Sequence, residues 1–362
     1  MKKIIFYNPS FETGGVEKNI ISFLGHLDTL SKYVPILVST DNIKIKLKKK
    51  KYTSIPKIKI NLKFRFFKYI LSFFYLVRIC FQSNCIILSF QNNIFALIAS
   101  IITNTKIIVR LNTSPEKYVK SKIIKTIFKF IYKKSDIILV NDEDFKKSVK
   151  LYFGLNARIV HNCVDIKKIN QYKRSKIKFS FFKKNYLKII SVGRLTLQKD
   201  HMTLIKAVNN SKKKNKFRVL ILGSGDQKKN IVNYIKQNNL EKIIKISEYK
   251  QNPYKYINQS NLFVLPSKYE GSPNILLEVA ALKKLIISTN CRTGPRMLLA
   301  NGKGGHLFKV GDYKQLSKIL DNVQLKSKLV KKKINHSFGL VKKYSVYRQK
   351  IELLNALKKI EN

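Results

Sequence analysis

The sequence predicts an α/β protein built from two doubly wound, Rossmann-like domains that face a cleft. Short apolar runs with the character of buried strands alternate with helical segments through both halves of the chain, as in parallel sheets covered by helices. The chain has 362 residues, which is enough for two domains of ordinary size. Several apolar runs end in glycine or polar residues, where an open parallel sheet binds its ligand.

The first domain is expected over residues 1–166 and opens with a buried strand at Lys3–Tyr7. A loop then leads to Gly14 and Gly15 and to a helix over Val16–Leu27. Glycines that open a helix after a strand let a ligand approach backbone N–H groups closely. The needs of the turn explain these glycines equally well, and the G-x-G-x-x-G fingerprint of a dinucleotide site is absent.

A basic, aromatic helix is predicted further along the first domain. From Leu62 to Arg78 the chain combines Phe and Tyr with Lys and Arg, in a helix that is apolar over much of its circumference. Helices of this kind lie on membrane surfaces, so we expect contact with an anionic membrane. The alternative is an ordinary helix that covers the sheet. The preceding lysine run, Lys44–Lys51, indicates a solvated loop.

An uncharged run over residues 79–105 is long enough to raise the question of a membrane span. Polar residues interrupt it twice, so we interpret it as a strand at Cys85–Ser89, a polar loop and a buried helix at Ile94–Ile102. No signal peptide is predicted, because the apolar run at Ile4–Tyr7 is too short for its core.

The strand at Lys106–Val109 ends at Arg110 and Asn112, which by position lie at the ligand edge of the first sheet. A later strand, Asp136–Val140, precedes Asn141–Asp144, whose spacing is that of a metal-binding D-x-D sequence. We interpret these acids instead as the cap and first turn of a helix. No metal site is therefore predicted.

The second half of the chain repeats the pattern of the first. A basic stretch without glycine or proline, residues 167–186, is predicted to be the linker. The second domain is expected over residues 187–335 and opens with a strand at Leu187–Val192. A helical tail at residues 336–362 is expected to pack back on the first domain.

Cationic residues follow the first strand of the second domain. Gly193 and Arg194 come directly after it, and Lys199 lies five residues beyond the arginine. Two cations at a strand end, close to the start of a helix, can hold a diphosphate and stabilise its charge as it leaves. The alternative is two surface cations among the 73 Lys and Arg residues of the chain.

The most informative stretch is Ser267–Ala281, which follows a buried strand at Leu262–Leu265. Ser272 and Pro273 are predicted to start a helix, with the serine hydroxyl as cap and the proline at the first helical position. A helix start of this kind directs backbone N–H groups toward negative or oxygen-rich ligands.

Two glutamates of this stretch are candidate ligand-binding residues. Glu270 lies in the predicted loop and Glu278 in the predicted helix, which places their carboxyl groups about 10 Å apart. The paired carboxylates of a glycoside hydrolase are closer, at roughly 5–9.5 Å. The wider separation suits two contacts with an elongated ligand. The alternative is a loop carboxylate and a surface helix residue that form no site.

This arrangement of strand, Glu270-Gly271 and, after seven intervening residues, Glu278 resembles the donor-site motif of family 4 retaining glycosyltransferases of the GT-B fold. The resemblance implies that Glu270 lies beside the donor sugar and that Glu278 binds the ribose of a nucleotide. Gly14 and Gly15 resemble the glycine loop that faces the donor phosphates in this family.

The segment from Gly193 to Lys199 resembles a second signature of the family. Two groups of residues follow from the resemblance. Those implied as catalytic are Glu270, Arg194 and Lys199. Those implied in donor binding are Gly14, Gly15, Arg194, Lys199, Glu270, Gly271, Ser272, Asn274, Ile275 and Glu278.

Arg110 and Asn112 become candidates for the acceptor side. Many relatives carry a histidine in this region and this chain does not, so a catalytic role on that side is not carried over. The resemblance implies no metal and no other cofactor.

The function expected from the resemblance is retaining, metal-independent transfer of a hexose or N-acetylhexosamine. The donor is a nucleotide sugar, UDP-linked, and the acceptor is a hydroxyl of a membrane-associated glycan. Such glycans belong to bacterial surface polysaccharide, lipopolysaccharide or lipid-linked oligosaccharide synthesis. The enzyme is expected in the cytoplasm, peripheral on the inner face of the cell membrane.

The formal net charge of +53 fits attraction to anionic lipid, nucleic acid or a phosphorylated substrate, although biased coding accounts for most of it. A nucleic-acid-binding protein is one alternative, but it leaves the Glu and Gly motifs unused, and nucleic acid is not expected as a partner. A non-catalytic glycan-binding relative is another. The four cysteines have neither zinc spacing nor a C-x-x-C pair, which fits a reducing compartment.

Overall fold

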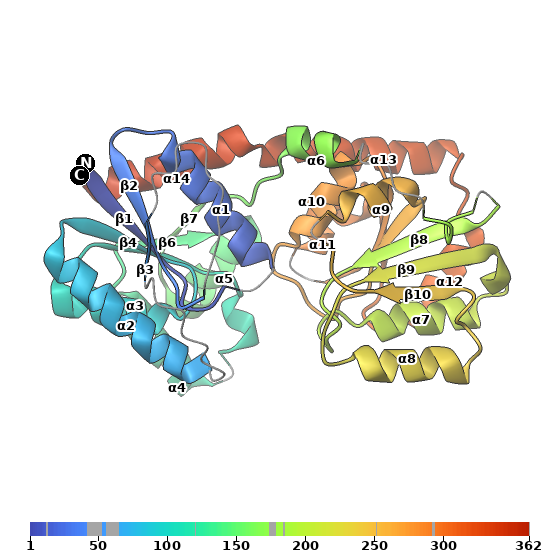
Figure 1. The fold of residues 1–362 in the computed structure, drawn as a ribbon, viewed down its shortest axis with the longest axis horizontal. Coiled ribbons are helices and arrows are strands. Elements are labelled where there is room, and N and C mark those ends of the chain that lie inside the picture. Colours follow the sequence, from blue (N-terminus) through green and yellow to red (C-terminus); the bar gives the residue numbers. More distant parts are fainter. Residues whose placement is uncertain are drawn as a thin grey trace. The chain divides into compact units, whose positions relative to one another are not determined.

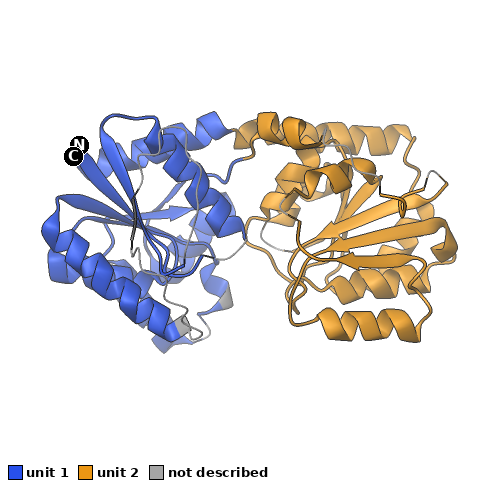
Figure 2. Cartoon of the chain, in the orientation of Figure 1, with its two compact units in different colours: residues 1–163, 346–362 blue, residues 164–345 orange. Residues whose placement is uncertain are grey.

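The computed structural model describes residues 1–11, 14–41, 53–55, 65–119, 121–173, 179–183, 185–250, 252–291 and 294–361. The chain divides into two compact units, unit 1 with residues 1–163 and 346–362 and unit 2 with residues 164–345 (Figure 2). Each unit is a parallel sheet with helices on both faces (Figure 1). The predicted class, two doubly wound α/β domains, is confirmed.

Unit 1 has a seven-stranded sheet in the order β3-β2-β1-β4-β5-β6-β7. Its strands are β1 (Lys2–Tyr7), β2 (Tyr33–Val38), β3 (Thr53–Ile55), β4 (Cys85–Ser89), β5 (Ile107–Arg110), β6 (Ile137–Val140) and β7 (Ala157–Ile159). Its helices are α1 (Gly15–Asp28), α2 (Arg65–Gln82), α3 (Asn93–Thr103), η1 (Pro115–Lys117), α4 (Lys122–Tyr132), α5 (Glu143–Phe153) and α14 (Val346–Glu361).

Unit 2 has a six-stranded sheet in the order β10-β9-β8-β11-β12-β13. Its strands are β8 (Leu187–Val192), β9 (Phe217–Leu222), β10 (Ile244–Ser247), β11 (Leu262–Leu265), β12 (Leu285–Thr289) and β13 (His306–Phe308). Its helices are α6 (Ile166–Lys173), α7 (His201–Asn210), η2 (Lys214–Lys216), α8 (Lys228–Gln237), α9 (Tyr254–Gln259), α10 (Asn274–Ala281), α11 (Pro295–Leu298), η3 (Ala300–Gly302), α12 (Tyr313–Asn322), α13 (Lys328–Val341) and η4 (Lys342–Tyr344).

Alternation along the strands separates the two apolar layers of unit 1. In β1, Ile4 and Phe6 pack on the side of α1 and α14, whereas Ile5 and Tyr7 pack on the side of α2 to α5. Because helices cover both faces of the sheet, both sets must be apolar, and the strand is a continuous apolar run. The strands of unit 2 follow the same rule, with successive residues of β11 in different layers.

The linker region differs from the prediction. The sequence predicts a linker between the domains over residues 167–186, but helix α6 occupies Ile166–Lys173 and belongs to unit 2. Ile169 and Phe182 are 2% and 8% exposed and join one apolar layer of that unit. Burial of these side chains stabilises the segment, and the many surrounding charges hide their periodicity in the sequence.

The chain passes between the units at residues 163/164 and again at 345/346. Within unit 2 the two ends lie side by side, because Val164 N donates a hydrogen bond to Tyr344 O over 2.9 Å. The predicted tail, residues 336–362, is divided between the two units, and its first part, in α13, lies in unit 2. Helix α14 lies in unit 1, where Leu353 and Leu357 pack in the layer that contains α1.

The uncharged run over residues 79–105 contains the end of α2, then β4 and α3, so the predicted order of strand, loop and helix is confirmed. The prediction that the helix is buried is wrong along one face, where Ile98, Ile101 and Ile102 are exposed. Among the described residues, no helix combines the length and the apolar character needed to cross a bilayer. The predicted loop at Lys44–Lys51 and residues 62–64 of the basic aromatic helix lie outside the described residues.

Candidate active site

The strand order of unit 2 reverses between β8 and β11. The chain runs outward from β8 to β10 on one side of the sheet and from β11 to β13 on the other. β8 and β11 are neighbours, with Ile189 opposite Leu262 and Ile190 opposite Phe263. The loops that follow them therefore lie together at the carboxyl edge, where open α/β sheets bind ligands. We call residues 193–200 the β8 loop and residues 266–273 the β11 loop.

A buried ion pair joins these two loops. Lys199 Nζ lies 2.5 Å from Glu270 Oε1, and the two side chains are 17% and 6% exposed. Ser267 Oγ donates a hydrogen bond to the same carboxylate oxygen over 2.6 Å. Removing one partner of a buried pair leaves an uncompensated charge, so the contact ties the loops together firmly.

Hydrogen bonds to main-chain oxygens hold the β8 loop on both sides. Lys268 N donates to Gln198 O over 2.8 Å, and Gln198 Nε2 donates to Tyr269 O over 3.1 Å. On the β9 side, Leu195 N donates to Ser224 O over 2.9 Å. The cationic loop is thus preorganised by contacts with both of its neighbours, as electrostatic binding of a ligand requires.

Glycines after β9 make the contact on that side possible. A Cβ on Gly223 would lie 1.9 Å from the carbonyl oxygen of Gly193, and a Cβ on Gly225 would lie 2.3 Å from that of Leu195. Both approaches are to backbone atoms, which cannot turn aside as a flexible side chain can. Neither position therefore accepts a larger residue without a shift of the β8 loop.

Helix α10 begins directly after the β11 loop, but its start differs from the prediction. Pro273, not Ser272, occupies the N-cap position, and Asn274 is the first helical residue. The ψ angle of Pro273 is 99°, which is outside the helical range. The prediction placed the proline one position too far into the helix, an error of the size expected at helix ends.

Both candidate carboxylates are buried. Glu270 and Glu278 are each 5% exposed, and Asn274 is 9% exposed. Glu278 is therefore not the surface helix residue of the alternative interpretation. Ile275 is partly buried against the layer beneath α10, and Arg194 is exposed at the start of the β8 loop. Gly271 and Ser272 are half-buried.

His201 is the first residue of α7, directly behind the β8 loop, and it is 2% exposed. Its Nδ1 lies 3.2 Å from Ser191 Oγ. Burial, reinforced by the nearby charge of Lys199, lowers the pKa of His201 to about 4. The imidazole is therefore neutral near pH 7 and adds no charge to the loop.

Unit 1 has a corresponding edge where its strand order reverses, between β1 and β4. Gly14 is the N-cap of α1, with an extended backbone, and Gly15 is the first helical residue. The expected glycine loop thus does lead into a helix in unit 1, although residues 12 and 13 lie outside the described chain.

Unpartnered amides mark this edge of unit 1. In the part of the chain that the structure describes, Asn8 Oδ1, Gln91 Oε1 and Asn92 Nδ2 are buried and have no hydrogen-bond partner. Asn8 follows β1 and the other two residues follow β4, and these strands are paired with Tyr7 opposite Ser89. Buried polar atoms are usually satisfied, so this edge offers hydrogen bonds to a polar ligand. Amide residues after two strand ends were the only signal for it in the sequence.

Asn112 and Arg110, the two acceptor-side candidates, contact this edge from β5. Asn112 Nδ2 donates to Phe90 O over 2.7 Å, and Asn93 Nδ2 donates to Arg110 O over 3.4 Å. The asparagine therefore supports the loop after β4.

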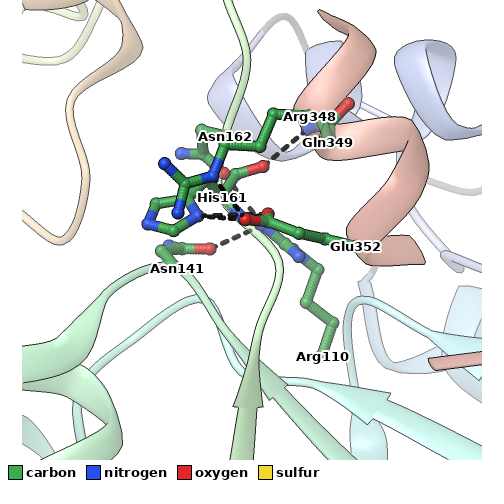
Figure 3. Close-up of polar contacts among 7 residues, drawn as sticks. All are labelled: Arg110, Asn141, His161, Asn162, Arg348, Gln349 and Glu352. Carbon is green, nitrogen blue, oxygen red and sulfur yellow. Dashed lines mark hydrogen bonds and ion pairs between the residues drawn. The ribbon is translucent and has the colours of Figure 1, made fainter. Parts of the chain in front are cut away.

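The Arg110 side chain is fully buried. It points toward Asn141 and Asn162 (Figure 3). Its Nη2 donates to Asn141 Oδ1 over 2.6 Å and to Asn162 Oδ1 over 2.9 Å, and its guanidinium carbon lies 5.1 Å from the ring centre of Phe23. Burial lowers the pKa of Arg110 to about 10, so it stays charged at pH 7. Its Nε and Nη1 are also buried and have no hydrogen-bond partner among the described residues. The guanidinium is therefore not exposed at this edge.

The same region receives the C-terminal helix α14 (Figure 3). Glu352 Oε1 lies 2.8 Å from His161 Nδ1 and accepts from Arg348 Nε over 2.9 Å, while Gln349 Nε2 donates to His161 O over 2.8 Å. Burial would raise the pKa of Glu352, but hydrogen bonds from His161 and Arg348 outweigh it, and the pKa lies below its ordinary value. This polar cluster fastens α14 to the end of β7.

The acidic sequence after β6 caps a helix. Asp142 is the N-cap of α5 and its Oδ1 accepts from Phe145 N over 2.8 Å, with Glu143 and Asp144 in the first turn. The interpretation of Asn141–Asp144 as a cap is therefore confirmed. Across the described residues, no three His, Cys, Asp or Glu side chains form a group that could hold a metal ion.

Comparison with known proteins relates unit 2 to one family and the whole chain to one fold. Residues 173–337, most of unit 2 and both of its loops, match the family model described as glycosyl transferases group 1. The solved structure of Anabaena HepE in complex with UDP and glucose has a TM-score of 0.80 with this chain at 15% identity, and the match covers 99% of this chain and 100% of that one. The chain has the GT-B fold, and its residues 173–337 match the group 1 glycosyl transferases.

Two curated proteins are similar to this chain in sequence. An uncharacterized glycosyltransferase of Methanocaldococcus jannaschii is 34% identical over 213 residues, or 56% of this chain and 52% of that protein. The N-acetylgalactosamine-N,N'-diacetylbacillosaminyl-diphospho-undecaprenol 4-alpha-N-acetylgalactosaminyltransferase of Campylobacter jejuni is 30% identical over 227 residues, or 60% of each chain. The chain thus spans between half and three-fifths of the length of these relatives.

The residues predicted to bind ligands fall into two groups. The structure brings one group together on the two loops and α10 of unit 2, namely Arg194, Lys199, Glu270, Gly271, Ser272, Asn274, Ile275 and Glu278. The other group, Gly14, Gly15, Arg110 and Asn112, lies in unit 1. Ser267, which holds Glu270, was absent from the predicted set because only the folded loop brings its hydroxyl to the carboxylate.

Proposed function

We propose that this protein is a retaining glycosyltransferase that moves a hexose or an N-acetylhexosamine from a UDP-linked sugar to a hydroxyl of a membrane-associated glycan. The observation that carries the proposal is the buried Lys199–Glu270 contact at the point where the strand order of unit 2 reverses. It sets a cation and a carboxylate side by side where a sugar diphosphate needs both.

The donor is assigned to unit 2. Arg194 and Lys199 bind the diphosphate, because two cations on one preorganised loop neutralise its charge. Glu270 accepts hydrogen bonds from hydroxyls of the sugar, and N–H groups at the start of α10 donate hydrogen bonds to its oxygens. Glu278 binds the ribose hydroxyls from within α10. In this assignment the two cations supply the charge stabilisation for which other transferases use a divalent metal.

The reaction exchanges one C–O bond for another. The bond from the anomeric carbon to the diphosphate oxygen breaks, and a bond to the acceptor hydroxyl oxygen forms on the same face of the sugar. The hydroxyl proton moves to an oxygen of the departing diphosphate, which becomes more basic as its bond breaks. Arg194 and Lys199 take up the charge of the leaving group, so they act more strongly in the transition state than before it.

The acceptor is assigned to unit 1. The amides of Asn8, Gln91 and Asn92 present buried hydrogen-bonding atoms without partners in the described chain, and neutral amides suit the hydroxyls of a glycan. Two relatives support the substrate classes. The Campylobacter jejuni protein is named for transfer of N-acetylgalactosamine to a diphospho-undecaprenol-linked sugar, and Anabaena HepE binds UDP and glucose. We assign this chain to the inner face of the membrane, where such acceptors are extended.

The test is nucleotide release from a panel of UDP- and GDP-sugars, with and without polyprenyl-diphosphate-linked sugar acceptors. The proposal predicts release from one UDP-sugar that depends on the acceptor, and a product with the same anomeric configuration as the donor, read by the NMR coupling of its anomeric proton. An inverted product would overturn the retaining mechanism. Failure to bind any nucleotide, with salt-sensitive retention on DNA, would instead support a nucleic-acid-binding protein.

A further inference from the structure

Helix α4 of unit 1 has two apolar stripes where a covering helix needs only one. Ile124, Phe128 and Ile131 pack against the apolar layer beneath the helix. Ile123, Ile127 and Phe130 repeat the same i, i+4, i+7 spacing but are 73%, 51% and 67% exposed. A soluble helix normally carries polar residues at such positions, so this outer stripe is unexplained by the fold.

Lysines flank the outer stripe. Lys122, Lys125 and Lys129 are exposed on α4, and Lys133 and Lys134 follow directly after it. The helix contains no Asp or Glu. An apolar stripe bordered by cations, with no carboxylate to repel lipid phosphate, is the composition of a helix that lies in the interface of an anionic bilayer.

The neighbouring helices extend this surface. Helices α2, α3 and α4 cover the same face of the sheet, with α3 in contact with both of the others (Figure 1). On α2, Phe67, Phe74 and Phe81 recur every seven residues and are 56% to 66% exposed. Neither α2 nor α3 contains an Asp or Glu. We call the outer surface of these three helices the α2–α4 face.

On α3, the exposed residues are again apolar. Ile98, Ile101 and Ile102 are 43%, 58% and 53% exposed, at the i, i+3, i+4 spacing of one helix face. This helix has no charged residue at all. Isolated apolar residues on a surface need no explanation, but contiguous ones on adjacent helices mark an interaction site.

We propose that the α2–α4 face docks on the surface of an anionic bilayer, with the outer stripe of α4 inserted at the level of the lipid headgroups. Charge decides between this occupant and a second copy of the chain. Two copies in contact through this face would bring like charges together, whereas anionic headgroups complement them. The inference extends the proposed function, on which it rests for the membrane-bound acceptor, and it does not depend on nucleotide binding.

Tryptophan fluorescence tests the insertion directly, because the chain contains no tryptophan. The variant Phe130→Trp gives the chain a single indole in the stripe of α4. A matched control is Leu329→Trp on α13 of unit 2, where the leucine is 60% exposed. Each variant is mixed with vesicles of phosphatidylcholine and phosphatidylglycerol, and with vesicles of phosphatidylcholine alone.

The proposal predicts a blue shift of F130W emission with the anionic vesicles, and quenching when those vesicles contain lipids brominated on their acyl chains. The L329W control should show neither change. Binding without a blue shift of F130W would mean adhesion through lysines alone and would overturn the proposal. A blue-shifted F130W in a dimeric protein without vesicles would assign the face to a second copy and would also overturn it.

Matched charge variants separate this face from the general basicity of the chain. Changing Lys122, Lys125 and Lys129 to Gln removes the same charge as changing Lys328, Lys331 and Lys332, exposed on α13, to Gln. The α4 variant should lower the vesicle partition coefficient about 100-fold, and the α13 variant by no more than a few-fold. Equal losses would overturn the proposal. UDP binding, measured in parallel, reports on the proposed function separately and should be unchanged in both variants.

Discussion

The carboxyl edges of the two sheets are built from different chemistry. In unit 2 the edge carries charge, with Lys199 and Glu270 paired and Arg194 exposed beside them. In the described part of unit 1 the corresponding edge carries neutral amides, among them Asn8 and Gln91. In our proposal the same topology supports a diphosphate site in one unit and a hydroxyl-binding site in the other.

The difference teaches that the fold supplies the location of a site and the loop residues supply its specificity. Charged groups at an edge need partners, and unit 2 supplies them through contacts between neighbouring loops. The amide atoms of unit 1 are left without partners, which costs less than leaving a buried charge without one. Substitutions on the two edges should therefore affect different substrates and by different amounts.

The largest effect is expected from breaking the ion pair of unit 2. Glu270→Gln keeps the shape of the side chain but leaves Lys199 without its carboxylate and weakens the hold on the sugar. We expect kcat/KM for the donor to fall about 100- to 1,000-fold, measured as acceptor-dependent nucleotide release. The matched control, Glu241→Gln, removes an exposed carboxylate just before β10, at the opposite edge of the sheet. Wild-type turnover in Glu270→Gln would refute the assignment of this edge to the donor.

The pH dependence of stability should reveal His201. Its pKa is about 4 in the folded chain against an ordinary 6.5, so the unfolded chain binds more protons between these values. Stability is therefore lost as the pH falls from about 6.5 to 4, by up to on the order of 3 kcal/mol from this group. Urea unfolding measures the free energy of unfolding at each pH. For His201→Gln this free energy should fall less between pH 6.5 and 4 than for the wild type, and above pH 7 its pH dependence should be unchanged. If the unfolding free energies of the variant and the wild type depended on pH identically below pH 6.5, burial of a neutral imidazole behind the β8 loop would be contradicted.

Smaller effects on stability, of opposite sign, are expected from alanine substitutions at two glycines of unit 2. Gly223→Ala places a Cβ on the Gly193 carbonyl and should cost about 1–3 kcal/mol of unfolding free energy and weaken donor binding. Gly339→Ala, in helix α13, meets no atom within 4 Å and should stabilise the chain by about 0.5–1 kcal/mol. Thermal unfolding of both variants measures the contrast. Equal shifts of Tm would argue against the close approach of Gly223 to the Gly193 carbonyl.

The smallest effect is expected on the amide edge of unit 1. Gln91→Ala removes one neutral hydrogen bond, so the acceptor KM should rise about 5- to 10-fold while the donor KM stays constant. Initial rates measured against each substrate in turn give both constants, with the exposed Gln324→Ala in unit 2 as control. A rise in the donor KM instead would place the donor, not the acceptor, on this edge.

The strands and their ligand edges could be predicted from sequence because both depend on local features. The runs at Leu187–Val192 and Leu262–Leu265 are apolar enough to be buried on both faces, and the structure has both strands with these bounds. Arg194 and Glu270 follow the carboxyl ends of these two strands, and this position is why both were predicted to bind a ligand. Position after a buried strand is a local signal, and it locates an edge reliably.

Contacts between distant segments could not be predicted in this way. The pairing of Lys199 with Glu270 spans 71 residues, and the burial of Arg110 depends on asparagines of two later segments. The outer stripe of α4 was missed because Ile123 and Ile124 look equally apolar in sequence. Only the fold decides which of the two faces the core, and the same holds for Ile169 in the predicted linker.

The central claim is that the charged edge of unit 2 binds the nucleotide, and amide hydrogen exchange with and without UDP tests it most directly. The account predicts that UDP slows exchange most strongly in the β8 loop, residues 193–200, and in the β11 loop with the start of α10, residues 266–278. Saturable UDP binding that leaves exchange in both segments unchanged would contradict it.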